Sequence, residues 1–566
     1  MTSLLSIVLF LPIGGAILLV FLPKDIPGPI KGGGLLFSLL TFVGSLGIVS
    51  RFHEGIGGFQ MVDSHAWIPQ WGINYAVGVD GISLWLVLLT TLLTPVVILA
   101  SWNSIHKHPK EYIMAMLVME SAMIGAFLAM DLVLFYVFFE LMLLPMYLII
   151  GVWGGKNRIY AAIKFFLFTI AGSLLMLLGI IYLGFQQVHL TPGGVPTFEI
   201  TQLYGLSLPP HIQTILFFAF ALAFAIKVPL FPLHTWLPDA HVEAPTGGSI
   251  ILAGVMLKMG TYGFLRFVLP FFPDASIHYA PLLICLSVIG IIYGALVAWV
   301  QPDMKKLVAY SSVSHLGFCV MGIFAINQAS IEGSILQMVN HGLSTGALFL
   351  LVGVIYERRH TRLLADYGGI ARTMPLFTVF FVIAMLSSAG LPGLNGFVGE
   401  FLILAGSFQT HPGYATVAAT GVILAAIYLL WLVQAVFFGP ITNEENRSIP
   451  DIAWNEIAAV VPLMIMIVWI GVHPNTFLRK MEPSVQQLLA TVKGEQPEKV
   501  MTASLAAPAT RRAVAQTLLS VRPAVAQTLL FVPPGSSSQG RQGHSSVGVL
   551  SRKAARTEVS VLQVTR

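Results

Sequence analysis

Apolar runs of about 20 residues recur along most of the chain and limit its fold more than any other feature. An α-helix of that length crosses roughly 30 Å of hydrocarbon, so each run predicts a membrane-spanning helix. The composition, 56% hydrophobic and only 10% charged, excludes an ordinary soluble domain. Because lipid leaves few other ways to satisfy backbone groups, we expect an all-α polytopic membrane protein.

The runs predict fourteen spans, the first of which has no basic segment before it and is therefore expected to remain in the protein. They lie near residues 4–22, 33–50, 79–101, 112–130, 131–150, 161–186, 212–231, 241–265, 279–300, 304–326, 332–356, 375–408, 414–438 and 455–474.

Basic residues divide unequally between the loops. When each loop is numbered by the span that it follows, the odd loops carry fourteen Lys and Arg, whereas the even loops carry only Arg51 and Arg266. Positive loops stay in the cytoplasm. The pattern therefore predicts an inner (plasma) membrane protein with a periplasmic N-terminus.

The C-terminal region differs in composition from the rest of the chain. Residues 501–566 hold eight Lys or Arg and one Asp or Glu, and the segment PPGSSSQGRQG (533–543) is typical of disorder. We therefore predict a membrane domain over residues 1–480 and a basic, disordered tail over 481–566.

Two predicted spans are interrupted. The seventh contains KVPLFP (227–232) and the twelfth AGLPGLNGF (389–397), and proline inside a helix removes a hydrogen bond. The breaks lie five helices apart, and a unit with an odd number of crossings must re-enter the membrane inverted. We therefore predict two inverted repeats, helices 4–8 (residues 111–268) and helices 9–13 (residues 279–438). Paired broken helices of this kind mark ion sites in transporters.

Titratable side chains lie deep in several spans: Glu140, Lys227, Lys258, His315, His341 and Glu400. A charge at the centre of a span costs about 2.5–3.5 kcal/mol on insertion scales, so four such charges cost on the order of 10 kcal/mol. These groups must therefore face one another or water. Carboxylates, lysines removed from water and histidines, whose two ring nitrogens both take part, together suit a proton relay.

Other interpretations of the same residues remain open. Glu140 alone could bond a neighbouring helix. His315 and His341 could ligate a haem in a one-electron carrier. His241 could do no more than satisfy the irregular backbone before Pro245. Cys285 and Cys319 have no metal-ligand spacing, so we expect no cluster of the four-cysteine kind in this chain.

Several motifs resemble the antiporter-like membrane subunits of respiratory complex I. The most specific is KVPLFPLHTWLPDAHVEAPTGGSIILAGVMLKMG (227–260), and the others are GVDGISLW (78–85), FFELMLLPMYLIIGVWGG (138–155), KKLVAYSSVSHLGF (305–318) and GLPGLNGFVGEF (390–401). Among these subunits the chain most resembles the M subunit, called chain 4 in mitochondria. The resemblance leads us to expect lysine at the position of Glu400 in the L and N subunits, and the L subunit continues beyond helix 14.

The resemblance implies proton translocation coupled to electron transfer from NADH to a quinone. The FMN, iron–sulfur clusters and quinone site belong to partner subunits, and the closest partners are the L- and N-type subunits. In the implied route, Glu140 pairs with Lys227, Lys258 is the central link, and His315 and His341 continue the axis. Glu400 is the terminal group, and His241 is a secondary candidate.

Related functions share these motifs. One alternative is a subunit of a multi-subunit sodium/proton antiporter without electron transfer. Membrane-bound hydrogenases and the photosynthetic NDH complex are closer variants, and a passive scaffold subunit is a further alternative. The set of subunits that copurify with the chain distinguishes among them.

Overall fold

The computed structural model describes residues 3–186, 188, 194–204 and 206–495. Contacts within the chain define two units, Met1–Met501 and Thr502–Arg566, and only the first contains described residues. The predicted tail therefore lies outside the described residues from position 496 onward.

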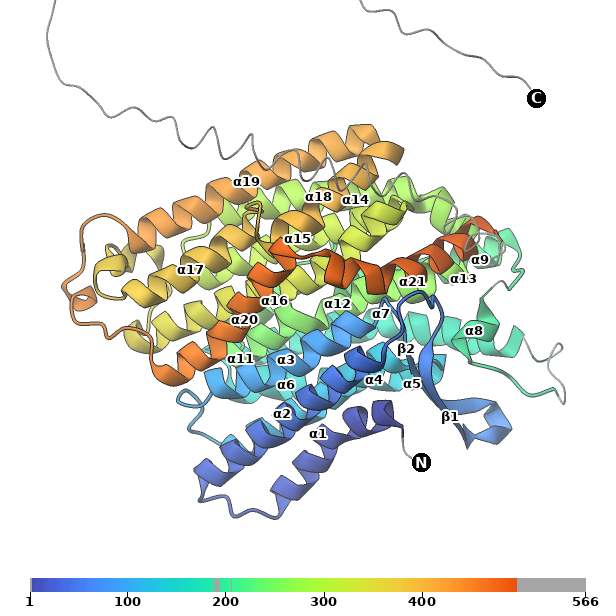
Figure 1. The fold of residues 1–566 in the computed structure, drawn as a ribbon, viewed down its shortest axis with the longest axis horizontal. Helices are drawn as coiled ribbons and strands as arrows, with labels where there is room; N and C mark the ends of the chain where they lie inside the picture. The colour runs from blue at the N-terminus through green and yellow to red at the C-terminus, as the bar shows by residue number, and fades with distance from the viewer. Residues whose placement is uncertain (1–2, 187, 189–193, 205, 496–566) are drawn as a thin grey trace, which may run out of the picture. The chain divides into compact units, whose positions relative to one another are not determined.

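The first unit is built almost entirely from helices (Figure 1). Those of the N-terminal half are α1 (Leu4–Val20), α2 (Pro27–Arg51), α3 (Leu84–Ala100), α4 (Pro109–Leu128), α5 (Leu132–Leu141), α6 (Leu143–Trp153), α7 (Arg158–Gln186), α8 (Ile200–Leu203), α9 (Pro210–Lys227), α10 (Trp236–Glu243), α11 (Thr246–Ile251), α12 (Lys258–Gly263) and α13 (Leu269–Phe271). Those that follow are α14 (Pro273–Trp299), α15 (Met304–Phe324), α16 (Gln328–Arg359), α17 (Pro375–Ser388), α18 (Asn395–Thr410), α19 (Pro412–Phe437), α20 (Trp454–Val472) and α21 (Asn475–Lys493).

Short irregular turns complete the unit. The 3₁₀ turns are η1 (Pro69–Trp71), η4 (Leu364–Asp366), η5 (Ile370–Arg372) and η6 (Glu444–Asn446). Two π-helical segments, η2 (Leu252–Met256) and η3 (Phe264–Val268), interrupt the eighth span (Thr246–Phe271) on either side of α12.

Each of the fourteen predicted spans coincides with a helix or with a run of consecutive helical segments. Eleven helices among the described residues are long and apolar enough to cross a membrane, and three shorter apolar helices, α1, α3 and α17, match further predictions. The predicted breaks are present, because α9 ends at Lys227 before α10 begins, and α17 ends at Ser388 before α18 begins. The expectation of an all-α polytopic membrane protein is confirmed.

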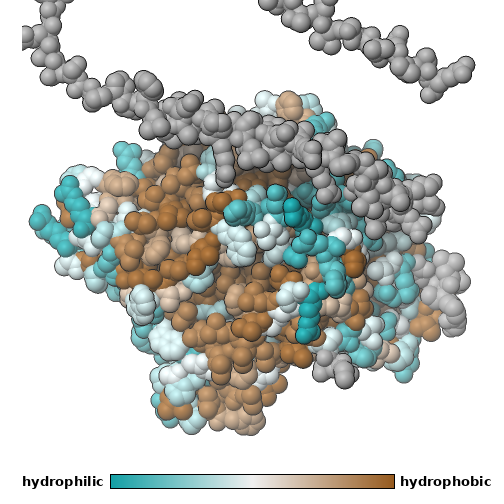
Figure 2. Space-filling view, in the orientation of Figure 1, coloured by the Kyte–Doolittle hydropathy of each residue, from teal (hydrophilic) through white to brown (hydrophobic). Residues whose placement is uncertain are grey.

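Helices at the perimeter expose apolar side chains, as a membrane protein requires. On α2, Leu36, Leu40 and Val43 are exposed, and on α20, Ile465 and Val468 are exposed. Figure 2 shows hydrophobic side chains over much of the face on which these two helices lie. By contrast, the eighth span and α16 are fully buried over their most apolar windows, so they form the centre of the bundle.

The odd loops meet one another on one side of the bundle. Lys31, after α1, donates to the carbonyls of Trp102 (2.6 Å) and Ile105 (3.0 Å), which follow α3. Lys110 donates to the carbonyls of Val20 (2.6 Å) and Leu22 (2.7 Å). These lysines therefore bond carbonyl groups that the ends of helices leave unsatisfied. We call this side the odd side.

The opposite, even side carries a feature that the predicted spans do not include. Strands β1 (Gln60–Ile68) and β2 (Ile73–Val79) form an antiparallel hairpin whose register shifts twice. Gly72 turns the chain between them with φ of +63°, and any side chain there would strike the carbonyl of Pro196. The hairpin is the only sheet in the described part of the chain.

Helix α21 corrects the predicted boundary of the tail. Residues 481–493 were expected to be disordered, but they continue α21 to Lys493. The Ser484 hydroxyl accepts from the amide of Gly81 (2.9 Å) and donates to the carbonyl of Gly57 (2.8 Å). Phe477, Met481 and Val485 lie on the apolar face of α21 and are buried against the core of the unit.

Candidate functional site

Helices α12, α15, α16 and α18 bring four of the predicted residues into one line. Lys258 Nζ lies 2.7 Å from His341 Nδ1 and also donates to the carbonyl of Ala253. His315 Nδ1 lies 2.8 Å from Glu400 Oε1. The two imidazole rings are 6.0 Å apart between centroids, so the line runs from Lys258 to Glu400 with a single gap between the histidines.

All four side chains are buried, with exposures of 0% for Lys258, 3% for each histidine and 4% for Glu400. Such groups face one another and not lipid, as the insertion cost requires. The π-helical segment η2 ends one residue before Leu257, which precedes Lys258, and the Ala253 carbonyl of this segment accepts from the lysine.

Glu400 lies just after the break in the twelfth helix and has two polar partners. Besides His315, Gln337 Nε2 donates to Oε1 at 3.0 Å. The break itself is held by Asn395, whose carbonyl accepts from Asn340 Nδ2 at 2.7 Å. The start of α18 is thereby tied to the polar face of α16.

The predicted pair Glu140 and Lys227 is arranged differently. Lys227 is 1% exposed, and its Nζ has no hydrogen-bond partner among the described residues. It lies 4.9 Å from the ring centroid of Phe139 and 5.8 Å from that of Phe165, within cation–π range. Glu140 and Lys227 act on each other electrostatically, but no direct hydrogen bond joins them in the described chain.

His241 lies elsewhere than predicted. It belongs to α10, the second half of the broken seventh helix, and not to the end of the eighth, because the span that follows begins only after Pro245. Its ring stacks flat on Phe349, with centroids 4.6 Å apart, and neither ring nitrogen has a hydrogen-bond partner within the described residues. Lys258 and Lys305 both act on it electrostatically.

Sequence reasoning missed several buried polar groups. Arg266, counted as a loop residue, lies buried in η3 and pairs with Asp80 at 2.6 Å, so it is not a topology signal. Tyr428 places its hydroxyl 3.3 Å from His315 Nε2. Glu120 is fully buried in α4. The one sequence signal for Glu120 is that it is a charged residue inside the apolar run of α4.

The haem alternative does not fit the geometry of the histidines. Each imidazole uses Nδ1 in a contact with Lys258 or Glu400, and the remaining nitrogen of His315 faces the Tyr428 hydroxyl. Both nitrogens of His315 thus have polar partners, which leaves it no free nitrogen for an axial bond.

Comparison with known proteins assigns the chain. Residues 129–427 match the family described as NADH:quinone oxidoreductase/Mrp antiporter, TM, and residues 43–131 match NADH-ubiquinone oxidoreductase chain 4, amino terminus. NADH-quinone oxidoreductase subunit M of Rickettsia conorii is 45% identical over 86% of this chain and 98% of its own.

Solved structures agree with the sequence matches. A chain of respiratory complex I from Thermus thermophilus with bound NADH aligns with a TM-score of 0.78 at 32% identity, over 86% of this chain and 99% of that one. A chain of the Mrp complex from a Dietzia species aligns with a TM-score of 0.75, over 88% of this chain and 100% of that one. Its 21% identity shows a shared fold alone.

The chain therefore belongs to the NADH:quinone oxidoreductase/Mrp antiporter family of membrane subunits. Within that family it is of the M, or chain 4, type, and it serves as a membrane subunit of an NADH-quinone oxidoreductase. The predicted resemblance and function are confirmed, and the sodium/proton antiporter alternative is less supported.

Proposed function

We propose that this chain moves protons through Lys258, His341, His315 and Glu400 while partner subunits carry electrons from NADH to a quinone. The observation that supports this most is the buried line of hydrogen-bonding groups between Lys258 and Glu400. Groups that exchange protons must lie within hydrogen-bond reach of one another or share a water molecule.

The histidines carry the proton across the middle of the line. Lys258 donates its proton to His341 Nδ1, and the imidazole releases a proton from Nε2, which has no other partner among the described residues. One water molecule between the rings is needed to reach His315. His315 Nδ1 then gives a proton to Glu400 Oε1.

Glu140 and Lys227 act before Lys258 in this proposal. When Glu140 takes up a proton, its negative charge disappears. The charged form of the buried Lys227 is then no longer stabilised by a nearby carboxylate. Lys227 then releases its own proton toward the eighth span, which α9 contacts where Val228 lies against Gly260. His241, acted on by Lys305 and Lys258, is a second point of entry from the odd side.

The membrane arrangement follows the charges of the loops. We place the odd side in the cytoplasm and the N-terminus in the periplasm of an inner membrane. Helices 4–8 and 9–13 form the two inverted repeats, supported by the two broken helices. The partners are other complex I subunits, above all the L- and N-type subunits, and FMN, iron–sulfur clusters and quinone belong to partners.

The test is Lys258→Ala in the intact complex, with the exposed loop lysine changed in Lys156→Ala as the matched control. We expect Lys258→Ala to lower NADH-driven proton uptake into membrane vesicles more than tenfold while the complex still assembles. The control keeps the native number of protons per electron. Native stoichiometry in Lys258→Ala contradicts the proposal.

A further inference from the structure

Glu120 of α4 is a buried acid that the proposed route does not use. Its side chain is 0% exposed, and neither carboxyl oxygen has a hydrogen-bond partner within the described residues. The hydroxyl that acts on it belongs to Thr94 of α3, which donates to the carbonyl of Thr90 at 3.1 Å. A buried carboxylate with no partner is costly, so Glu120 holds its proton at rest.

The register of α4 against the eighth span sets the depth of Glu120. The Tyr262 hydroxyl donates to the carbonyl of Phe127 at 3.1 Å, a contact across 135 positions, and Tyr112 lies against Gly247 at the same offset. The two helices therefore run parallel and in step. Glu120 is level with Val255 in η2, and Lys258 is three residues, about 4.5 Å, further along the axis.

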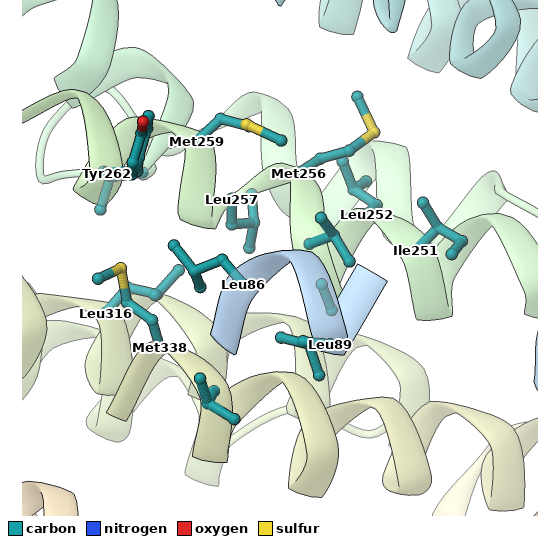
Figure 3. Packing of buried hydrophobic residues seen from close by; sticks show 14 of the residues in the cluster. Leu86, Leu89, Ile251, Leu252, Met256, Leu257, Met259, Tyr262, Leu316 and Met338 are labelled. Atoms are coloured by element: carbon teal, nitrogen blue, oxygen red, sulfur yellow. The ribbon is translucent and has the colours of Figure 1, made fainter. Parts of the chain in front are cut away.

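Glu120 also faces the eighth span. Tyr112 and Phe127 both contact that span, and Glu120 is eight residues after the first and seven before the second, so all three share one face of α4. Helix α3 packs beside the same part of the eighth span, because Leu93 lies against Gly254. Figure 3 shows Leu86 and Leu89 of α3 packed beside Leu252, Met256 and Leu257 of the eighth span.

Glu140 lies near the same depth on the other neighbour of α4. Helix α5 packs back along α4, and Phe138 lies against Gly125. This antiparallel pairing sets Glu140 level with Met123, one turn from Glu120. The acid on α4 is thus at the depth of both Glu140 and Lys258, on a helix that contacts both of their elements.

We propose that Glu120 is an additional proton-transfer residue of this subunit. Its carboxylic acid gives its proton, through water that enters between α3, α4 and the eighth span, to the neutral amine of Lys258, and the resulting carboxylate is reprotonated from the side of Glu140. The step is a proton transfer from oxygen to nitrogen and needs no other reactant. This inference rests on the proposed function, since Lys258 is its acceptor.

The variant that tests it is Glu120→Gln in the assembled complex, because glutamine keeps the volume and neutrality of the acid but cannot release a proton. Ser121→Ala is the matched control: Ser121 lies at the same depth, but its hydroxyl faces α1, where it accepts from the amide of Ile13. We expect Glu120→Gln to lower the protons moved per electron at least twofold and to remove a carboxylic-acid C=O band from the redox-difference infrared spectrum. Ser121→Ala changes neither.

Normal proton stoichiometry in Glu120→Gln overturns the inference. If Glu120→Gln does not assemble, Glu120→Asp keeps an acid at the site and must shift the frequency of the same band; an unshifted band also overturns it. Lys258→Ala, measured in parallel, separates the two ideas. Loss of pumping in Lys258→Ala with normal pumping in Glu120→Gln rejects the role of Glu120 alone, whereas normal pumping in Lys258→Ala rejects the proposed function.

Discussion

The two parts of the proposed route are lined by different kinds of side chain. Between Lys258 and Glu400, polar side chains follow one another at 2.7–2.8 Å on either side of a single gap between the histidines. Around Lys227, the neighbours are the rings of Phe139 and Phe165, and the ammonium donates to no group in the described part of the chain.

Helix α16 accounts for this difference. It places Gln337, Asn340, His341 and Ser344 on one face, at helical spacing, against the break of the twelfth helix. Lys227, at the end of α9, lies by contrast near the rings of Phe139 and Phe165. The first region can therefore hold a proton on fixed side chains, whereas the second needs water molecules to pass it on.

The largest effect should come from the region around Lys227. We expect Glu140→Gln and Lys227→Ala each to lower the turnover that is coupled to pumping more than tenfold. Each variant removes a charge that acts on the remaining residue of the pair. Proton uptake per electron in vesicles is the measurement, and subunit content by electrophoresis controls for assembly. Normal stoichiometry in either variant would remove this pair from the route.

Glu400 should show a graded effect. Glu400→Ala removes the acceptor for His315 and Gln337, and we expect a loss of about tenfold in coupled turnover. Glu400→Lys should retain more activity, because a titratable group remains and the Gln337 amide can rotate to present its oxygen. Equal losses in the two variants indicate that the acceptor geometry, and not proton exchange, is what this position supplies.

The smallest effect should come from Tyr428→Phe. Its hydroxyl lies 3.3 Å from His315 Nε2, a longer contact than the one that His315 makes with Glu400. We expect coupled turnover to fall less than twofold, measured as for the other variants. A tenfold loss of coupled turnover would instead include the Tyr428 hydroxyl in the line between Lys258 and Glu400. The difference between this polar region and the aromatic surroundings of Lys227 would then be larger.

Helix breaks and buried charges could be predicted from the sequence because proline, glycine and charged residues are unusual within apolar runs. The interruptions are indicated by prolines at 229 and 232 and by glycines at 390 and 393. Lys258 is recognisable as a charged residue inside an apolar span. Glu120 is likewise a charge inside an apolar run, but no break or motif accompanies it.

Contacts between distant segments could not be predicted in this way. Asp80 and Arg266 are 186 positions apart, and nothing local to either indicates that they pair at 2.6 Å. The same holds for α21, whose sequence favours a helix with one apolar face but does not say which surface covers that face.

The sequence by itself determined the membrane class, the fourteen spans, the two breaks and the ionisable groups of the proposed route, because each follows from hydropathy and backbone chemistry within a single segment. The tertiary structure decided which of those groups meet. Lys258 reaches His341, and His315 reaches Glu400, only because α16 and α18 pack beside the eighth span and α15. The π-helical turns that orient Lys258 depend on the same packing, since hydrogen bonds of that type are rarely favoured by sequence alone.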